Sequence, residues 1–298
     1  MQKVTILQKL CRGVLNRMVY ILPDKWFLFL RFRNEVGYWP HLNHPRTFNE
    51  KLQWLKLHDI HPEYTQMVDK IEAKKYVASK FEGGGKYIIP TLGIWNSVDE
   101  IEWDKLPQKF VIKVSSDSGG IVVCKDKQKL DICAAKKVLS YGWGRDCSVR
   151  NKEYPYRNIT PRIIAEEYKE DESGYELKDY KIFCFNGEPK LLFVATDRQK
   201  DTEETKFDFY DLQWNHLPFK NGHPNSKRSL EKPKNFEQML DIARKLSAGI
   251  PHVRIDLYNC NGNIYFGEMT FFHNSGMVPF EPLEWDFKLG GLLNLPKI

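Results

Sequence analysis

The segment from Phe110 to Lys127 combines a lysine with a short loop rich in serine and glycine. It reads FVIKVSSDSGGIVVCKDK, so Lys113 ends an apolar run, a Ser/Gly loop follows, and a β-branched run comes next. Small residues let backbone amides approach phosphate oxygens, and a lysine offsets part of the phosphate charge. The pattern predicts a phosphate-binding loop. It is not a Walker loop, because no Gly-Lys-Ser/Thr sequence follows and a strand rather than a helix is expected next.

Two carboxylates stand in neighbouring β-like runs near the end of the chain. Asp256 lies in RIDLY and Glu268 in YFGEM, and the runs are joined by Asn261-Gly262, a pair typical of tight hairpin turns. A hairpin would bring the two carboxylates side by side, where they repel each other unless a cation lies between them. Oxygen ligands close to phosphates suit Mg²⁺. The pattern therefore predicts a magnesium site.

The surrounding sequence indicates which elements position these groups. A capping box, Thr47 with Glu50, begins a helix that runs to His58, and a second helix is expected from about Met67 to Phe81. From Arg162 onward, strand-like runs alternate with turn pairs such as Asn186-Gly187, and one helix is expected from Phe236 to Ala248. These signals predict an α+β protein with a largely antiparallel sheet.

Composition sets the class of protein. The 298 residues are 42% hydrophobic and 28% charged, which favours a folded chain of one or two domains over a disordered one. No apolar run approaches the roughly 18–20 residues that span a bilayer, and no signal-peptide cleavage site follows the amino terminus, so we expect a cytoplasmic protein. The net charge of +6 is compatible with an anionic partner.

The first 33 residues are strongly basic. Their single acid is Asp24, and their bases are Lys3, Lys9, Arg12, Arg17, Lys25, Arg31 and Arg33. Leu7, Leu10 and Val14 share one helical face, so we expect an amphipathic helix that Pro23 ends. Such a helix could dock on an anionic membrane at its inner face, or it could pack on its own domain.

Taken in order, these motifs resemble the ATP-grasp superfamily. More narrowly, the chain is similar to TupA-like ATP-grasp proteins, which are linked to teichuronopeptide and capsular polysaccharide synthesis. The segments that carry the resemblance are FNEKLQWLKL, DKIEAKKYV, LPQKFVIKVSSDSGG, RIIAEEY, DYKIFCFNGEP and GEMTFF. It implies an ATP-grasp fold in which two α+β lobes hold ATP between antiparallel sheets. The implied parts are an N-terminal helical region (1–65), a small lobe with its leading helix and phosphate loop (66–169) and a large lobe with the metal site (170–298).

The resemblance also implies which residues bind ATP. Lys70 and Lys113 would contact the α- and β-phosphates, and Asp179 would bind the ribose or the phosphate network. The loop that would close over the triphosphate consists of Ser115, Ser116, Asp117, Ser118, Gly119 and Gly120. The residues that would form the adenine hinge are Glu166, Glu167, Tyr168 and Lys169.

The remaining implied roles concern the reaction. Lys181 and Arg198 would face the γ-phosphate and the developing acyl phosphate. Asp256 and Glu268 would bind Mg²⁺, and Thr270 stands where the superfamily usually has a third, asparagine ligand. The residues placed to meet the acceptor or the amine are His273, Asn274, Ser275 and Gly276.

The implied activity is ATP-dependent ligation of a carboxylate and an amine through an acyl phosphate. The carboxylate would belong to a uronic acid in a capsular or cell-wall glycan, and the amine to an amino acid or another amine. Three alternatives remain open: a glycosyltransferase, although the chain has no Asp-x-Asp triplet, an ATP-dependent sugar phosphotransferase, and a nucleotide-binding scaffold. We expect no nucleic-acid partner, because the bases beyond residue 33 are dispersed.

Overall fold

The computed structural model of the protein describes residues 5–117, 119–174, 176–197 and 204–297. The helices are α1 (Ile6–Arg17), α2 (Asp24–Val36), α3 (Phe48–His58), α4 (Tyr64–Val68), α5 (Glu72–Lys80), α6 (Ile132–Trp143), α7 (Cys147–Asn151), α8 (Phe236–Ser247) and α9 (Glu284–Leu292). The strands are β1 (Thr91–Trp95), β2 (Phe110–Val114), β3 (Ile121–Cys124), β4 (Ile163–Glu167), β5 (Asp179–Phe185), β6 (Glu188–Thr196), β7 (Lys206–Asp211), β8 (His216–Leu217), β9 (Lys220–Asn221), β10 (His252–Cys260), β11 (Asn263–Thr270) and β12 (Phe280–Glu281).

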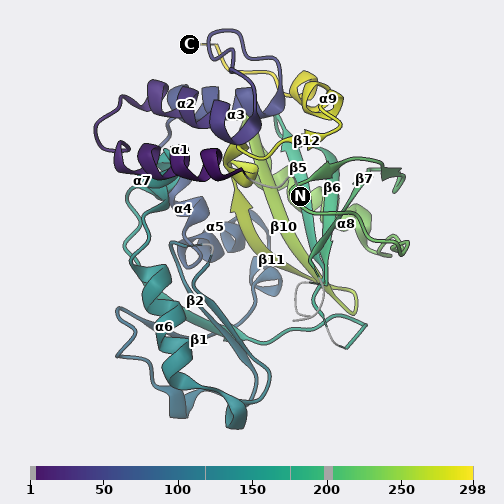
Figure 1. The fold of residues 1–298 in the computed structure, drawn as a ribbon. Coiled ribbons are helices and arrows are strands. Elements are labelled where there is room, and N and C mark those ends of the chain that lie inside the picture. The colour runs from purple at the N-terminus through teal and green to yellow at the C-terminus, as the bar shows by residue number, and fades with distance from the viewer. Residues whose placement is uncertain (1–4, 118, 175, 198–203, 298) are drawn as a thin grey trace.

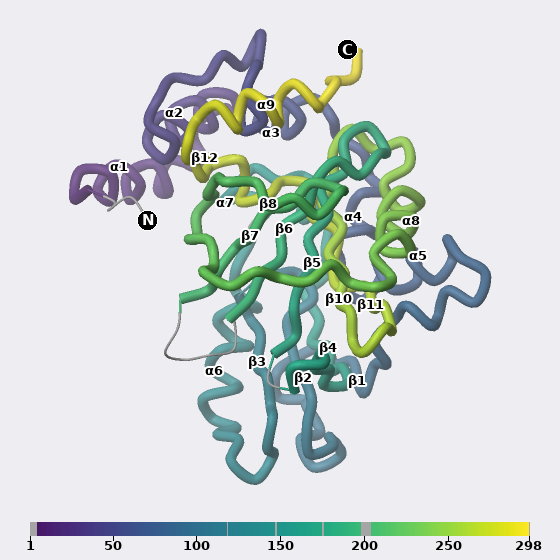
Figure 2. The backbone as a smooth tube through the Cα atoms, turned by 90° about the vertical axis from the view of Figure 1, so that its right-hand side faces the viewer, coloured from purple at the N-terminus to yellow at the C-terminus, as the bar shows by residue number. Residues whose placement is uncertain are grey.

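Two antiparallel sheets organise the described part of the chain. The smaller has the order β1-β4-β2-β3, the larger has the order β11-β10-β5-β6-β7-β8, and β12 pairs with β9 apart from both. In Figure 1 the smaller sheet and α6 lie below the larger sheet, and α1 to α3 and α9 lie above it. Figure 2 shows α5 and α8 on one side of the larger sheet. The predicted α+β class is confirmed.

Each sheet has its own apolar core. The smaller sheet packs on α6 through residues such as Ile112, Leu139 and Ala165. The larger sheet packs on α8 and also on α3 to α5, through residues such as Leu52 and Val77. The helices that precede the smaller sheet therefore share the core of the larger one. The limits of the two lobes, at residues 65 and 169, stay predictions.

Two Asn-Gly turns set the register of the larger sheet. Asn186 and Gly187 join β5 to β6, Asn261 and Gly262 join β10 to β11, and all four residues have positive φ. This conformation matches the twist of a tight hairpin and is easiest for Gly and Asn. Both predicted hairpins are confirmed.

The capping box of α3 is also confirmed. The Thr47 side chain accepts a hydrogen bond from the backbone N–H of Glu50 (3.2 Å), and the Glu50 carboxylate accepts one from the backbone N–H of Thr47 (3.0 Å). These contacts satisfy N–H groups that the first helical turn leaves without partners.

The helix expected from Met67 to Phe81 is instead two helices, α4 and α5. The carboxylate of Asp69 accepts hydrogen bonds from the backbone N–H groups of Ile71 (2.7 Å) and Glu72 (3.2 Å). A side chain that binds these N–H groups starts a new helix rather than continuing the old one. Lys70 therefore lies at the break, beside the phosphate loop, rather than inside a helix.

The N-terminal helix is shorter than predicted, since α1 ends at Arg17. Leu15 is buried, whereas the side chains of Leu7, Leu10 and Val14 on its apolar face are 70%, 63% and 56% exposed. Among the residues that the structure describes, no helix is both long and apolar enough to cross a membrane.

Candidate active site

A cavity of about 520 Å³ brings together parts of the chain that are far apart in sequence. Ser116 lines it from the phosphate loop, Lys70 from the break between α4 and α5, and Glu268 and Thr270 from β11. Its other walls come from α1, α2, α7 and the segment 272–278. The cavity thus brings Lys70 and Ser116, predicted to bind phosphate, together with Glu268 and Thr270, predicted to bind metal, whereas Lys113 and Asp256 are not among its lining residues.

The charged residues behind this cavity alternate along neighbouring strands. Asp256 pairs with Glu268 across β10 and β11, and with Lys181 across β10 and β5. Arg254, two residues before Asp256, pairs with Thr270. Residues two apart in a strand share one face of a sheet, so these groups meet on the same face. The predicted side-by-side arrangement of the two carboxylates is confirmed.

A β-bulge aligns that pair. Asp256 pairs with Glu268 while the next residue, Leu257, pairs with Phe266, so Gly267 has no partner of its own on β10. A Cβ on Gly267 would lie 3.1 Å from the backbone oxygen of Asp256 and 3.2 Å from the ring of Tyr258. The glycine leaves room for the extra residue, and the bulge turns Glu268 toward the face of Asp256.

Arg254 organises the carboxylate cluster. Its Nε donates to Asp256 (2.7 Å), and one terminal nitrogen donates to Asp256 (2.8 Å), Glu268 (3.2 Å) and the Thr270 hydroxyl (3.0 Å). Its other terminal nitrogen lies 2.7 Å from Nδ1 of His273. Sequence reasoning missed Arg254, although its spacing from Asp256 along a strand was a usable signal.

Lys181 supplies the second cation. Its Nζ contacts the carboxylate of Asp256 and lies 2.6 Å from that of Asp179. Burial raises the pKa of Asp256 to about 6. Burial would also raise the pKa of Glu268, but the cations Lys181, Lys70 and Arg254 outweigh it and lower that pKa. In the described part of the chain, no group of three His, Cys, Asp or Glu side chains could hold a metal ion alone.

The phosphate loop is held in place by its own side chains. The Asp117 carboxylate accepts hydrogen bonds from the backbone N–H groups of Gly119 (2.9 Å) and Gly120 (3.0 Å), and Nζ of Lys70 donates to the backbone oxygen of Asp117 (2.7 Å). The Ser115 hydroxyl accepts from the backbone N–H of Arg162 (3.1 Å). Asp117 and Ser115 therefore shape the loop.

Ser116 differs from its neighbours in the loop. Its hydroxyl is buried and has no hydrogen-bond partner within the described residues, and the residue lines the cavity. A buried hydroxyl without a partner is costly, typically about 1–3 kcal/mol. Ser116 is thus the loop hydroxyl best placed to donate to a bound ligand.

The far end of the loop packs against α6. A Cβ on Gly142 would lie 2.6 Å from the Cα of Gly120, and a Cβ on Gly120 would lie 3.1 Å from the Cα of Gly142. Two glycines thus allow the backbones of loop and helix to approach closely.

Glu166 lies between two lysines rather than facing the cavity. Its carboxylate is 2.5 Å from Nζ of Lys113 and 2.5 Å from Nζ of Lys74, a residue that sequence reasoning missed. Further along the predicted hinge, Lys169 pairs with Glu167 (2.8 Å), and Nζ of Lys109 lies 5.6 Å from the ring centre of Tyr168.

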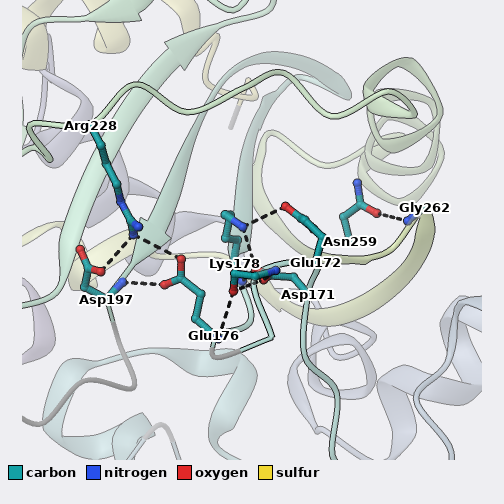
Figure 3. A network of polar contacts seen from close by, with 9 residues as sticks. Asp171, Glu172, Glu176, Lys178, Asp197, Arg228, Asn259 and Gly262 are labelled. Atoms are coloured by element: carbon teal, nitrogen blue, oxygen red, sulfur yellow. Dashed lines mark hydrogen bonds and ion pairs between the residues drawn. The ribbon is translucent and has the colours of Figure 1, made fainter.

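A network of ion pairs fixes the chain after the hinge (Figure 3). Lys178 binds Asp171 (2.9 Å) and Glu172 (3.0 Å). Arg228 binds Glu176 (3.2 Å) and Asp197 (3.0 Å). These contacts connect the loop before β5 to the end of β6 and to the segment beyond β9, so ion pairs hold the chain that follows the predicted hinge.

The four predicted substrate residues separate in the structure. Asn274 and Ser275 line the cavity, whereas His273 and Gly276 do not. His273 is buried, its Nε2 lies 2.8 Å from the Asn221 side-chain oxygen, and burial lowers its pKa well below the usual value. Both ring nitrogens are engaged, so His273 positions Arg254 and packs the segment. Two further predicted residues, Ser118 and Arg198, lie outside the described residues.

Several solved structures are similar to this chain at low identity. A D-alanine–D-alanine ligase from Bacillus anthracis, in complex with ATP, is 14% identical over 69% of this chain and 53% of its own (TM-score 0.41). One from Helicobacter pylori is 16% identical over 83% and 69% (TM-score 0.43). An L-amino acid ligase from Bacillus licheniformis is 12% identical over 76% and 47% (TM-score 0.45). The chain thus spans about half the length of the two Bacillus enzymes.

The amino-acid sequence of the chain matches one protein family over most of its length. No curated protein matches the chain. The profile of the family described as TupA-like ATPgrasp matches residues 50–294, most of the chain and every predicted site residue from Lys70 to Gly276. The match confirms the predicted ATP-grasp superfamily. The chain belongs to the TupA-like ATP-grasp family.

Proposed function

We propose that the protein is an ATP-dependent carboxylate–amine ligase. The observation that carries the proposal is that one cavity is lined by Ser116 of the phosphate loop, by Lys70 beside that loop and by Glu268 of the carboxylate pair. Phosphoryl transfer depends on positioned cations and donors more than on a protein nucleophile, and this cavity offers such groups.

The residues fit ATP with Mg²⁺. Asp256 and Glu268 offer only oxygen ligands, the type that Mg²⁺ prefers. Phosphate oxygens and water would fill the coordination positions that the two carboxylates leave open. When bound, Mg²⁺ neutralises part of the phosphate charge. Arg254 and Lys181 hold the two carboxylates in place, and Thr270, bonded to Arg254, lies next to them.

In the proposed reaction, a carboxylate oxygen of the substrate attacks the γ-phosphorus and ADP leaves. The amine nitrogen then attacks the acyl carbon, phosphate leaves, and the nitrogen loses a proton. Lys70 and Lys113 bind the α- and β-phosphates, and Ser116 donates to a phosphate oxygen. Lys181 and Arg198 stabilise the charge of the transferring group. Asn274 and Ser275, which line the same cavity, contact the substrate.

The proposed carboxylate is that of a uronic acid in a capsular or cell-wall glycan or its precursor, and the amine is an amino acid or another amine. The family supports this substrate class through its link to teichuronopeptide and capsular polysaccharide synthesis. Because the reaction consumes ATP, we place it in the cytoplasm.

We also propose that α1 contacts the inner face of the membrane. Its exposed side chains Leu7, Leu10 and Val14 form an apolar strip, and Lys9 and Arg17 on the same helix are exposed bases. Apolar side chains flanked by bases fit an anionic lipid surface. Co-sedimentation with phosphatidylglycerol vesicles, but not with phosphatidylcholine vesicles, is expected, and the double variant Leu7→Ser, Leu10→Ser should lose it. Equal recovery of wild type and variant with both lipids would contradict this contact.

The test of the ligase proposal is release of ADP and phosphate in the presence of Mg²⁺, with glucuronate or galacturonate and a panel of amino acids and simple amines. A ligase requires both a carboxylate and an amine. ADP release with a sugar alone, with phosphate retained on the sugar, would make the protein a sugar kinase. A nucleotide sugar consumed without ATP would make it a glycosyltransferase.

A further inference from the structure

We propose that Arg31 and Arg150 form a subsite for a substrate carboxylate, on the cavity wall supplied by the N-terminal helices and α7. This inference rests on the proposed ligase function and adds where the substrate is bound. Both arginines line the same cavity as Lys70, Ser116 and Glu268.

The two arginines are neighbours. A terminal nitrogen of Arg31, on α2, donates to the backbone oxygen of Arg150, on α7, and to the side-chain oxygen of Asn151 (3.2 Å). This fixes the Arg31 guanidinium against α7. Its Nε is buried and donates to no acceptor in the part of the chain that the structure describes. Arg31 therefore retains an unsatisfied donor.

Two carboxylates that line the same cavity, those of Glu35 and Glu153, act on the charge of Arg31, but both also bind or face other groups. Glu35 lies near Arg31 but already binds Arg12 through two hydrogen bonds. Glu153, the other nearby acid, accepts a hydrogen bond from the Ser275 hydroxyl (2.7 Å) and lies 3.9 Å from Nζ of Lys56. The Arg150 side chain has no hydrogen bond or ion pair to any described residue. Two adjacent cations with unused donors favour an anion between them.

A carboxylate suits these donors. Guanidinium groups present paired N–H donors in a plane and bind carboxylates through two parallel hydrogen bonds. The subsite shares one cavity with Lys70, Ser116 and Glu268, so a substrate bound there would lie in the same space as the transferred phosphate. Arg31 precedes the region that matches the family, residues 50–294. It is therefore suited to a contact that selects this protein's own substrate.

The carboxylate could come from an amino-acid acceptor or from a uronic acid, and calorimetry separates the two sources. The protein is first saturated with Mg²⁺ and the non-hydrolysable analogue β,γ-imido-ATP. One arm compares glycine and L-glutamate with glycinamide, and the other compares glucuronate and galacturonate with glucose. We expect the carboxylate probes of one arm to bind and the neutral probes to bind at least tenfold more weakly.

The variants Arg31→Gln and Arg150→Gln should weaken binding of that carboxylate by about 10- to 100-fold and leave the affinity for β,γ-imido-ATP unchanged. Arg31→Lys keeps the positive charge but not the paired N–H donors, so its carboxylate affinity should lie between those of Arg31→Gln and wild type. An intermediate affinity would show that the loss in Arg31→Gln does not come from unfolding. Arg17→Gln, which removes an exposed arginine of α1 outside the cavity, is the matched control and should bind as wild type does.

Equal carboxylate affinity in wild type, Arg31→Gln and Arg150→Gln would overturn the subsite, and so would the absence of binding by every carboxylate probe to the wild-type protein. Failure of β,γ-imido-ATP to bind would instead overturn the ligase proposal. In that case the carboxylate probes are titrated into the protein without nucleotide. Weaker binding to the Arg31→Gln and Arg150→Gln variants than to wild type would support the subsite, and equal binding would overturn it.

Discussion

Nζ of Lys113 lies 2.5 Å from the carboxylate of Glu166, although the two residues were predicted to bind different parts of ATP, the α- and β-phosphates and the adenine. Lys74 contacts the same carboxylate, so one buried acid compensates two lysines beside the phosphate loop. The charge that Lys113 can offer to a phosphate is therefore set partly by Glu166.

Replacement of Glu166 by Gln should destabilise the protein by about 2–4 kcal/mol, because two largely buried lysines lose their counter-charge. Glu167→Gln is the control, since Glu167 is half exposed, and should cost less than about 1 kcal/mol. Burial would raise the pKa of Glu166, but Lys113 and Lys74 outweigh it and lower the pKa. The stabilisation by this carboxylate is thus present above its unfolded pKa and lost as pH falls through its folded pKa. Urea unfolding of wild type and both variants at several pH values measures the loss of stability and its dependence on pH. Equal stability of the two variants at pH 7 would contradict the prediction.

Replacement of Gly142 by Ala should disturb the phosphate loop. The new Cβ would lie 2.6 Å from the Cα of Gly120, so loop or helix must shift, at a cost of about 1–3 kcal/mol. We expect weaker binding of β,γ-imido-ATP by calorimetry as well as a lower melting temperature. Gly144→Ala, two residues further, meets no atom closer than 3.8 Å and should behave as wild type. If both alanine variants bind nucleotide equally, the close contact does not shape the loop.

Replacement of Glu268 by Gln should abolish Mg²⁺-dependent ADP release while the protein stays folded. The side chain is 39% exposed, so its amide can be solvated, but an amide is a weaker Mg²⁺ ligand than a carboxylate. Mg²⁺ titration of ADP release, together with thermal unfolding, checks both parts. Turnover at the wild-type level over the same Mg²⁺ range would remove Glu268 from the metal site.

Asp286 should make stability depend on pH. This buried carboxyl group accepts hydrogen bonds from the backbone N–H (2.9 Å) and side-chain N–H (3.1 Å) of Asn49, and burial raises its pKa from 3.8 to about 7. The folded chain then holds a proton that the unfolded chain releases, so stability falls as pH rises from about 4 to about 7.

Asp286→Asn should remove that pH dependence, because an amide keeps the acceptor and never ionises. The variant should gain roughly 2–4 kcal/mol relative to wild type between pH 4 and pH 8. Denaturant unfolding of both proteins across that range is the measurement. Parallel stability curves would show that Asp286 ionises in the folded state as readily as in the unfolded one.

The sequence predicted those features that depend on local geometry. The Asn261-Gly262 turn and strand alternation were enough to place Asp256 beside Glu268, and the Thr47–Glu50 capping box was enough to begin α3. The break at Lys70 was missed because helical periodicity continues through it, while the Asp69 side chain caps the next helix.

The remaining site residues depend on tertiary contacts. Arg31 and Arg150 are 119 positions apart and meet only because α2 packs near α7. His273 follows the metal strand directly and so seemed placed for the substrate, but its ring turns toward Arg254 and Asn221 in the interior. Nothing in the spacing of residues distinguishes these two orientations.

The single unpaired residue at Gly267 has a consequence for how this hairpin can vary in evolution. Deletion of Gly267 would make Phe266 and Glu268 neighbours in a regular ladder, opposite Leu257 and Asp256, and would keep the two carboxylates on one face. Residues added equally to both strands at the Asn261-Gly262 turn would leave the pair intact. Relatives can therefore lose this residue, or lengthen the hairpin at its tip, without separating the carboxylates, whereas a one-residue shift in the pairing of β10 with β11 would turn Glu268 away from Asp256.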